Sequence, residues 1–205
     1  MAALDVRDPL ACLALVDACG EAALNATGPE AAIRAIASRY YEALGDRTAH
    51  EREGALKAGE RQYFVAGGFF ITPDGAWHML VGNVNFPLEQ ERLMIPIDGG
   101  HPGWVVKNRS KLLLRNTDEH GQFRQYLKTS RMGSAIFAPL FWQGEILGQI
   151  VMAAQARYTM RDEDLAVLVA CSRAAAAVWI AHGGPAWLAA NYPPPNPFKV
   201  GLDGV

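Results

Sequence analysis

Two apolar runs separated by a short polar turn constrain the fold of this chain more than any other feature. The runs Ser134–Phe141 and Ile146–Gln155 have the length and hydrophobicity of buried strands. Because only a few residues separate them, we predict that they pair as neighbouring antiparallel strands. A helix is expected to follow from Met160–Arg161, with Leu165 and Leu168 among its apolar residues. The chain is therefore expected to build a sheet that a long helix closes.

Two helices are expected before the first strand. Asp8 is an N-cap acceptor in front of Pro9, and proline is favoured in the first turn of a helix. A second helix is predicted to start at Pro29 and to end near Gly45. Its apolar residues recur at three- and four-residue steps, which is the pattern of a helix with one buried face. These residues are Ile33, Ile36, Tyr40 and Leu44.

The middle of the chain predicts further strands. Thr72–Gly75 has a proline and a glycine where a tight turn needs them, so we expect a hairpin between strands at 62–71 and 76–81. Two more strands are expected at 92–97 and 112–115.

Short helices and one charged segment are expected between these strands. One short helix is predicted to begin at Gly103-Trp104, and another to carry Phe123, Tyr126 and Leu127. Residues 46–62 are strongly charged and contain two glycines. They are consistent with a solvated loop, an exposed helix, a lid over a pocket or a disordered insertion.

Together these elements predict an α+β fold with a central, mainly antiparallel sheet. Helices near the N- and C-termini flank the sheet, and short helices cover its other side. We divide the chain into an N-terminal helix in residues 1–28, a domain in residues 29–182 and a proline-rich C-terminal tail in residues 183–205. The tail has too few apolar side chains for a core of its own, so we expect it to extend from the domain or dock against it.

Charge and hydropathy limit the classes of partner. The formal net charge of −2 provides no strong field for nucleic acid or an anionic membrane, and no basic recognition helix is present. No apolar run approaches the roughly 20 residues that span a bilayer. We therefore expect a cytoplasmic protein that binds neither nucleic acid nor membrane.

The three cysteines are Cys12, Cys19 and Cys171. Their spacing matches neither a metal site nor a redox motif, and Cys12 and Cys19 are too far apart on one helix for a disulfide. We expect buried thiols that act as small hydrophobic side chains, and no metal site.

Two places in the chain resemble the GAF family, and the resemblance extends from about Pro29 to Val178. Gly103–Val106 followed by Lys111–Asn116 is similar to the family's glycine-tryptophan helix start and the strand after it. The second place resembles the family's serine-led strand, glycine turn and acidic helix start. It consists of Ser134–Leu140, Gly144–Ile150 and Asp162–Asp164. GAF domains are mostly small-molecule sensors, so the resemblance implies ligand recognition more than a reaction.

The resemblance leaves the cofactor unknown and bears on four ligands or activities. No cysteine lies between Cys19 and Cys171, which argues against covalent bilin attachment and against the cysteine cluster of the family's free methionine sulfoxide reductases. For cyclic nucleotides, the chain keeps an acidic pair after an aromatic residue but lacks the preceding asparagine-lysine pair. That acidic pair also suits a helix N-terminus, which is the reading we prefer. Haem would need one histidine, and the candidates are His78, His101 and His120.

If the resemblance holds, the ligand lies between the sheet and the short helices. The candidate apolar walls are Phe70, Trp104, Phe123 and Tyr126. The candidate polar contacts are His101, Arg115, Arg131 and Ser134, with Asn83 and Asn85 as weaker choices. A small anion is the leading ligand class, because guanidinium and ammonium groups flank the expected pocket helix. They are Arg115, Arg124, Lys128 and Arg131.

We therefore expect a GAF-like sensor that binds a small anion or metabolite and signals to a separate output protein, with a homodimer as one assembly. No nucleophile elbow, metal-ligand spacing or phosphate loop indicates an enzyme. Two alternatives stay open. One is a protein-interaction module whose pocket is filled by its own side chains. The other is an enzyme on a GAF scaffold whose catalytic groups meet only in space.

Overall fold

One mixed sheet of seven strands organises the chain, in the order β4-β5-β6-β1-β2-β3-β7. The computed structural model describes residue 5 and residues 8–129 and 131–204. The strands are β1 (Phe64–Ile71), β2 (Trp77–Val84), β3 (Leu93–Pro96), β4 (Leu112–Leu114), β5 (Ser134–Trp142), β6 (Glu145–Ala154) and β7 (Phe198–Lys199). The α-helices are α1 (Pro9–Leu24), α2 (Pro29–Ala43), α3 (Gly100–Asn108), α4 (Asp162–Ala181) and α5 (Gly184–Ala190). All neighbouring strands are antiparallel except β3 and β7, so the predicted α+β fold with a mainly antiparallel sheet is confirmed.

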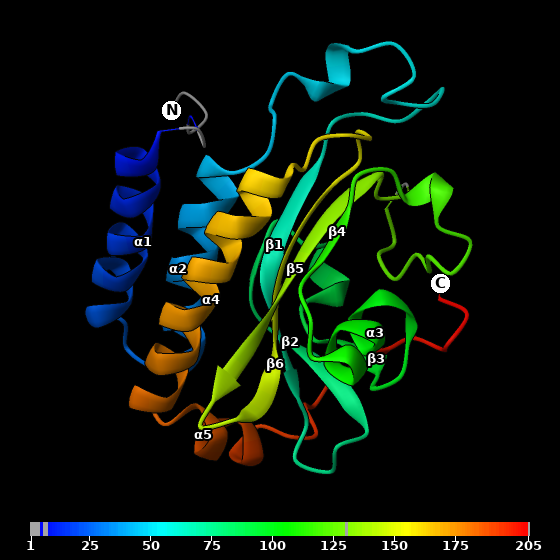
Figure 1. Cartoon of the computed structure of the whole chain (residues 1–205). Helices are drawn as coiled ribbons and strands as arrows, with labels where there is room; N and C mark the ends of the chain where they lie inside the picture. The colour runs from blue at the N-terminus through cyan, green and yellow to red at the C-terminus, as the bar shows by residue number, and fades with distance from the viewer. Residues whose placement is uncertain (1–4, 6–7, 130, 205) are drawn as a thin grey trace.

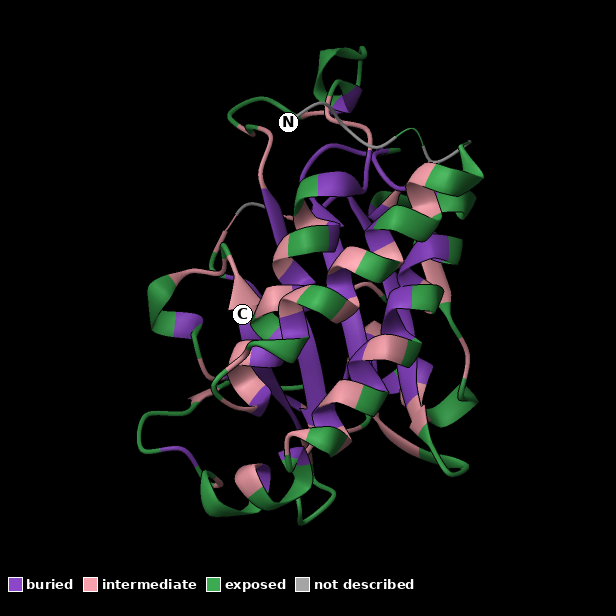
Figure 2. Cartoon of the chain, turned by 90° about the vertical axis from the view of Figure 1, so that its left-hand side faces the viewer, coloured by how far each residue is buried: buried purple, intermediate pink, exposed green. Residues whose placement is uncertain are grey.

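The helices and loops divide between the two faces of the sheet. α1, α2 and α4 lie on one face, and α3 lies on the other with the loops after β4 and the C-terminal segment (Figure 1). We call these the helix face and the pocket face. The strands of the sheet are buried behind the helix layer (Figure 2).

Side chains alternate between the two faces, because successive residues of a strand point in opposite directions. In β5, Ile136 and Ala138 belong to the core of the helix face, whereas Ala135 and Phe137 belong to the core of the pocket face. Both faces of the central strands are covered, which explains why their sequences are continuously apolar.

Aromatic side chains fill the helix-face core. Phe70 of β1 and Trp179 of α4 stack with ring centroids 3.8 Å apart. Tyr40 of α2 is fully buried, and its hydroxyl donates to the carbonyls of Gly67 and Val151 at 3.2 and 3.3 Å. α2 is therefore tied to the middle of the sheet by packing and by hydrogen bonds.

The expected starts of α1 and α2 are confirmed, whereas α3 begins at Gly100, three residues before the expected Gly103. The Asp8 carboxylate accepts from the N–H of Leu10 at 2.9 Å, and Pro9 begins α1. Pro29 begins α2. α4 has 20 residues and a mean hydropathy of 1.7, enough by length and composition to cross a membrane, but half of this stretch is buried in the fold. It is the core helix that closes the sheet.

The C-terminal tail contributes to the sheet instead of merely extending from it. α5 begins directly after Gly183, and β7 pairs in parallel with β3. Val200, just after β7, is buried in the pocket-face core. The prolines between α5 and β7 prevent a longer helix, as expected, yet the chain returns to supply an edge strand.

Residues 46–62 form turns and one short 3-10 helix, Ala49–Glu51, at one end of the sheet (Figure 1). Ala49 and Ala55 pack against Ala156 in a small cluster of their own. This segment contributes no side chain to the candidate pocket described below, so it is not a lid over that pocket.

Two thiols that are 152 residues apart in sequence meet between helices. The Sγ atoms of Cys19 in α1 and Cys171 in α4 are 3.8 Å apart, and both residues are fully buried. The expected burial is confirmed for these two, whereas Cys12 is half-buried; among the described residues none of the three forms a disulfide. Spacing along the chain gives no indication of such a contact.

Asp164 joins the start of α4 to the end of α2. Its carboxylate is fully buried and accepts from the backbone N–H groups of Gly45 and Arg161, both at 2.9 Å. The Arg161 guanidinium adds a third contact at 3.1 Å. Asp164 therefore caps the start of α4 and fixes it against the end of α2.

We predict that Asp164→Ala destabilises the protein by about 3 kcal/mol, because two buried N–H donors and a guanidinium lose their acceptor. Chemical denaturation measures this change. Glu163→Gln, at an exposed neighbouring position, is the matched control and should stay within about 0.5 kcal/mol of the parent protein. Equal stability of the two variants would contradict this role of Asp164.

Candidate functional site

The pocket-face core encloses a small apolar cavity of about 70 Å³. Strands β1, β5 and β6 form its floor, and α3 and the loop 123–127 form its outer wall. We call this space the inner cavity. The residues lining it are Val65, Phe69, Phe86, Leu93, Ile95, His101, Pro102, Phe123, Arg124, Gln125, Tyr126, Leu127, Met132, Ala135, Phe137, Val151 and Ala153.

A larger and more polar hollow of about 560 Å³ lies beside the inner cavity. We call it the vestibule. It is lined by Asp98, Gly100, His101, Trp104, Leu112, His120, Gln122, Arg124, Leu202 and Asp203. His101 and Arg124 line both spaces and therefore mark the boundary between them.

Glycines let α3 approach its neighbours closely at this boundary. A Cβ on Gly103 would lie 2.4 Å from the backbone carbon of Asp98. This contact gives a physical reason for the glycine that precedes Trp104. Gly100 has a φ of +48°, and a Cβ there would lie 2.7 Å from the hydroxyl of Tyr126. Both positions therefore require glycine, one for space and one for space and backbone conformation.

The Tyr126 hydroxyl is a buried donor without a partner among the described residues. The side chain is 7% exposed and lies against Gly99 and Gly100. Burial raises the pKa of Tyr126 to about 12, so the phenol stays protonated. A buried polar atom that lacks a hydrogen bond costs free energy, and a ligand that accepts this hydrogen bond would recover it.

His101 carries no charge at neutral pH in the free protein. Burial lowers its pKa to about 4, with further lowering from His120, Arg124 and Arg131. Its ring packs 5.8 Å from the ring of His120 and 5.7 Å from that of Phe123, centroid to centroid. The imidazole is therefore a neutral group whose protonation a bound anion would favour.

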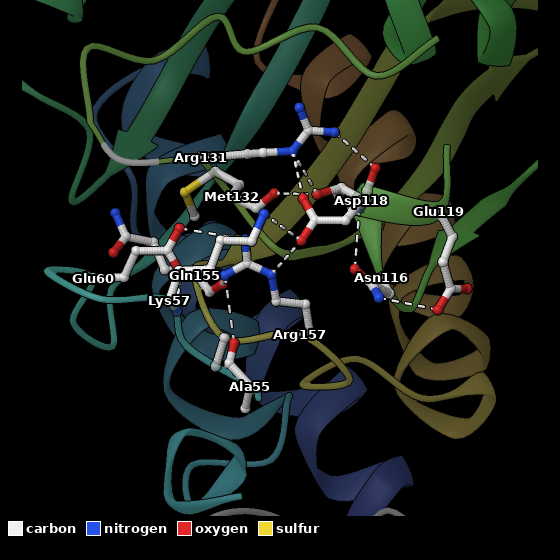
Figure 3. A network of polar contacts seen from close by, with 12 residues as sticks. Ala55, Lys57, Glu60, Asn116, Asp118, Glu119, Arg131, Met132, Gln155 and Arg157 are labelled. Carbon is white, nitrogen blue, oxygen red and sulfur yellow. Dashed lines mark hydrogen bonds and ion pairs between the residues drawn. The ribbon is translucent and has the colours of Figure 1, made fainter. Parts of the chain in front are cut away.

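A network of ion pairs around Asp118 includes Arg131 and Arg157 (Figure 3). The Arg131 guanidinium lies 4.5 Å from the centre of the Phe123 ring, and its Nε atom pairs with Asp118 at 3.1 Å. Its Nη2 atom also donates to the carbonyl of Thr117 at 2.7 Å. Arg131 is thus engaged by protein acceptors and is not free to bind a ligand.

The same network neutralises a buried cation. Arg157, 1% exposed, pairs with Asp118 at 3.0 Å and with Glu60 (Figure 3). Lys57 adds an ion pair to Asp118 at 2.8 Å. These contacts lower the pKa values of both carboxyl groups, against the opposing effect of burial. Segment 46–62 is therefore linked through Asp118 to the wall of the inner cavity.

Comparison with known proteins identifies the fold. The sequence profile of the GAF domain matches residues 29–179, about three quarters of the chain. The chain belongs to the GAF domain family. A comparison with curated protein sequences finds no match.

Solved GAF structures resemble this domain at low sequence identity. The GAF domain of a phosphoenolpyruvate-protein phosphotransferase from Coxiella burnetii is 19% identical, with a TM-score of 0.68, and the match covers 86% of this chain and 96% of that one. A free methionine-R-sulfoxide reductase from Neisseria meningitidis, solved in complex with its substrate, is 15% identical, with a TM-score of 0.64 and coverages of 85% and 92%. At these identities the likeness shows the fold alone.

The GAF domain brings four of the predicted site residues together. His101, Phe123 and Tyr126 line the inner cavity, and Trp104, 39% exposed, lines the vestibule with His101. The helix expected around Phe123 is absent, because the described residues 120–129 form turns and an extended loop. Phe123 and Tyr126 therefore lie beside the inner cavity on a loop and not on the expected helix.

The other strong candidates lie away from both spaces. Phe70 and Ser134 sit on the helix face, where Phe70 stacks on Trp179 and the Ser134 hydroxyl donates to Leu114 at 3.0 Å. The sequence assigned both to the wrong face, because a strand is two-sided and its register is set by its partners. Arg115 forms an ion pair with Asp162 on the surface, outside the site.

The two weaker candidates also lie outside the site, and their side chains donate hydrogen bonds to backbone carbonyls. Asn85 donates to the carbonyl of Phe64 at 2.7 Å, and Asn83 donates to that of Glu91 at 3.3 Å. Neither residue lines the inner cavity or the vestibule.

Arg124 was predicted to be one of the cationic groups near the pocket, but not one of the polar contacts of the ligand. The structure places it at the boundary of the two spaces, where its Nη1 atom has only long contacts, at 3.3 and 3.4 Å, to the carbonyls of Gly121 and Phe123. Its place among the cationic residues that flank the expected pocket helix was the available signal.

We predict that the free energy of unfolding falls as the pH is lowered from about 6.5 to about 4. His101 has a lowered pKa in the folded state, as does His78, for which burial lowers the pKa to about 4. Between pH 6.5 and 4 both imidazoles bind protons in the unfolded state but stay neutral in the folded state. Lowering the pH in this range therefore favours the unfolded state.

Denaturant titrations at a series of pH values measure this dependence. In His101→Gln it should become shallower between pH 6.5 and 4, because one of the two buried imidazoles is gone. An unchanged slope in that variant would show that His101 titrates normally in the folded protein.

Proposed function

We propose that this GAF protein is a sensor that binds a small organic anion across the inner cavity and the vestibule and passes the bound state to a separate partner protein. The observation that carries the proposal is the position of Arg124 at the boundary of the two spaces. Among the described residues, no carboxylate forms an ion pair with Arg124. The chain's other arginines beside the site, Arg131 and Arg157, are already paired.

Each part of the site suits a different part of such a ligand. The carboxylate would meet the Arg124 guanidinium, and charge-assisted hydrogen bonds of this kind are among the stronger contacts in proteins. Tyr126 would supply a hydrogen bond that its hydroxyl lacks in the free protein. His101 would take up a proton more readily beside the anion, since a nearby negative charge raises the pKa of an imidazole.

The size of the inner cavity limits the apolar part of the ligand. A space of about 70 Å³ admits a short hydrocarbon group but not a large ring system. The vestibule, at about 560 Å³, has room for the polar part of the ligand and water. Both spaces together favour a small metabolite over haem or bilin.

We propose binding rather than turnover for this site. The two buried cysteines that meet, Cys19 and Cys171, belong to the helix-face core, on the opposite side of the sheet from the cavity. Their thiols are therefore not placed to react with a molecule in the pocket.

One observation favours a second function, a protein-interaction module without a ligand. The inner cavity is small because aromatic and aliphatic side chains already fill most of the pocket face. In this alternative the protein's own residues occupy the space that a ligand occupies in a sensor.

In this proposal the separate partner, or a second copy of the chain, binds to the exposed side of α1. Leu10 and Leu13 are 76% and 66% exposed on its outer side. α1 packs on α2 and α4, so a change in the domain would reach this surface through helix contacts.

A titration with 4-methylpentanoate and its alcohol analogue 4-methylpentan-1-ol tests the anion site. We expect the carboxylate to bind more tightly, and Arg124→Gln to weaken it about tenfold or more, because a charged hydrogen bond is lost. Isothermal titration calorimetry gives both affinities. Arg115→Gln, which removes a surface arginine outside the site, is the matched control and should bind within about twofold of the parent protein.

Native mass spectrometry of the freshly purified protein completes the test. A small molecule that is lost on denaturation would support the sensor. If no molecule is retained and neither probe binds at millimolar concentration, the sensor fails and the interaction module is favoured.

A further inference from the structure

We infer that the ligand of this site is a zwitterion, an α-amino acid with a short apolar side chain. The inference rests on the proposed ligand-binding function and names the ligand class. It comes from two carboxylates in the vestibule. A ligand with only negative charge would leave these carboxylates unpaired, and they would repel it.

Asp98 and Asp203 line the same vestibule as Arg124. Within the residues described by the structure, neither carboxylate makes an ion pair or a side-chain hydrogen bond. His101, whose pKa is lowered to about 4, adds no charge at neutral pH. The vestibule therefore combines one unpaired guanidinium with two unpaired carboxylates.

Negative and positive side chains both affect the buried hydroxyl of Tyr126. The raised pKa of Tyr126 has burial as its main cause, and it is raised further by Asp98 and Asp203 and lowered by Arg124. All three charged groups also line the vestibule. Tyr126 lines the inner cavity, and its unpartnered hydroxyl lies against Gly100, which lines the vestibule, so a polar head group near this hydroxyl would be close to both signs of charge.

The position of Asp203 is set by the C-terminal segment of this chain. Phe198 pairs with Leu93 across β7 and β3, and Val200 donates its N–H to the carbonyl of Met94 at 3.1 Å. Gly204, with a φ of +94°, approaches Gln125 so closely that a Cβ would lie 2.5 Å from its carbonyl oxygen. Asp203 is therefore held beside the vestibule by an edge strand before it and a close backbone contact after it.

This segment lies outside the part of the chain that matches the GAF profile, which ends at residue 179. Part of the vestibule is therefore built by a C-terminal addition to the domain. An α-ammonium group would offset Asp98 and Asp203, an α-carboxylate would bind Arg124, and a short apolar side chain would enter the inner cavity.

Matched probes separate this inference from the anion site. We would first rank valine, leucine, isoleucine and methionine by calorimetry. The tightest amino acid is then compared with its deamino acid, which lacks the ammonium group, and with its amine, which lacks the carboxylate. We expect the amino acid to bind at least tenfold more tightly than either analogue.

Variants of the carboxylates provide the decisive comparison. Asp203→Asn and Asp98→Asn should weaken the amino acid about fivefold or more, and should leave the deamino acid unchanged or bound more tightly, because a repulsive charge is removed. Asp17→Asn, an exposed position on α1, is the matched control and should change neither affinity. Thermal unfolding of each variant confirms that it is folded.

Each other outcome is distinct. If the deamino acid binds as tightly as the amino acid and the Asp variants alter nothing, the zwitterion inference is wrong while the anion sensor stands. If only the amine binds, and binds through Asp98 or Asp203, both are wrong and the site takes cations. If no amino acid, deamino acid or amine binds to the folded protein, the proposed sensor function is wrong along with the inference.

Discussion

Burial of the sheet on both faces is the constraint on which the structure depends. The central strands carry apolar side chains in both directions, so each face needs a cover. α2 and α4 cover one face, with Trp179 stacked on Phe70. The other face is covered by α3, loops and the C-terminal segment. Irregular segments pack less completely than helices, and the inner cavity lies in that cover.

The buried guanidinium of Arg157 explains how these loops are held. A buried cation is costly unless it is paired and hydrogen-bonded, and Asp118 and Glu60 provide its partners. Asp118 also pairs with Arg131, whose guanidinium packs on the ring of Phe123. The carboxylate that neutralises Arg157 therefore also positions Arg131 against Phe123. The shape of the cavity wall therefore depends on ion pairs outside the cavity. The same requirement anchors the charged segment 46–62 at the end of the sheet.

Much of the fold was predictable because it rests on local rules. Each of these rules involves only residues that are near one another in sequence. They predicted the helix cap at Asp8, the turn at Thr72–Gly75 and the strands β5 and β6, and the structure contains all of them. The site was only partly predictable. His101 and Tyr126, two of the expected contacts, line the inner cavity, since α3 and the loop 123–127 lie on one side of the sheet. Phe70 was placed on the wrong face, because strand register depends on the partner strands.

The sequence by itself determined most of the helices and strands up to α4, the α+β class and the resemblance to the GAF family, since these follow from periodicity, capping and short motifs. Only the tertiary structure decided which charges are free. Arg115, Arg131 and Arg124 look alike in sequence, yet two of them find carboxylates and one does not. It also decided that a proline-rich tail brings Asp203 to the vestibule and that Cys19 meets Cys171. Such pairings join residues far apart in the chain, and their geometry depends on how every intervening element packs.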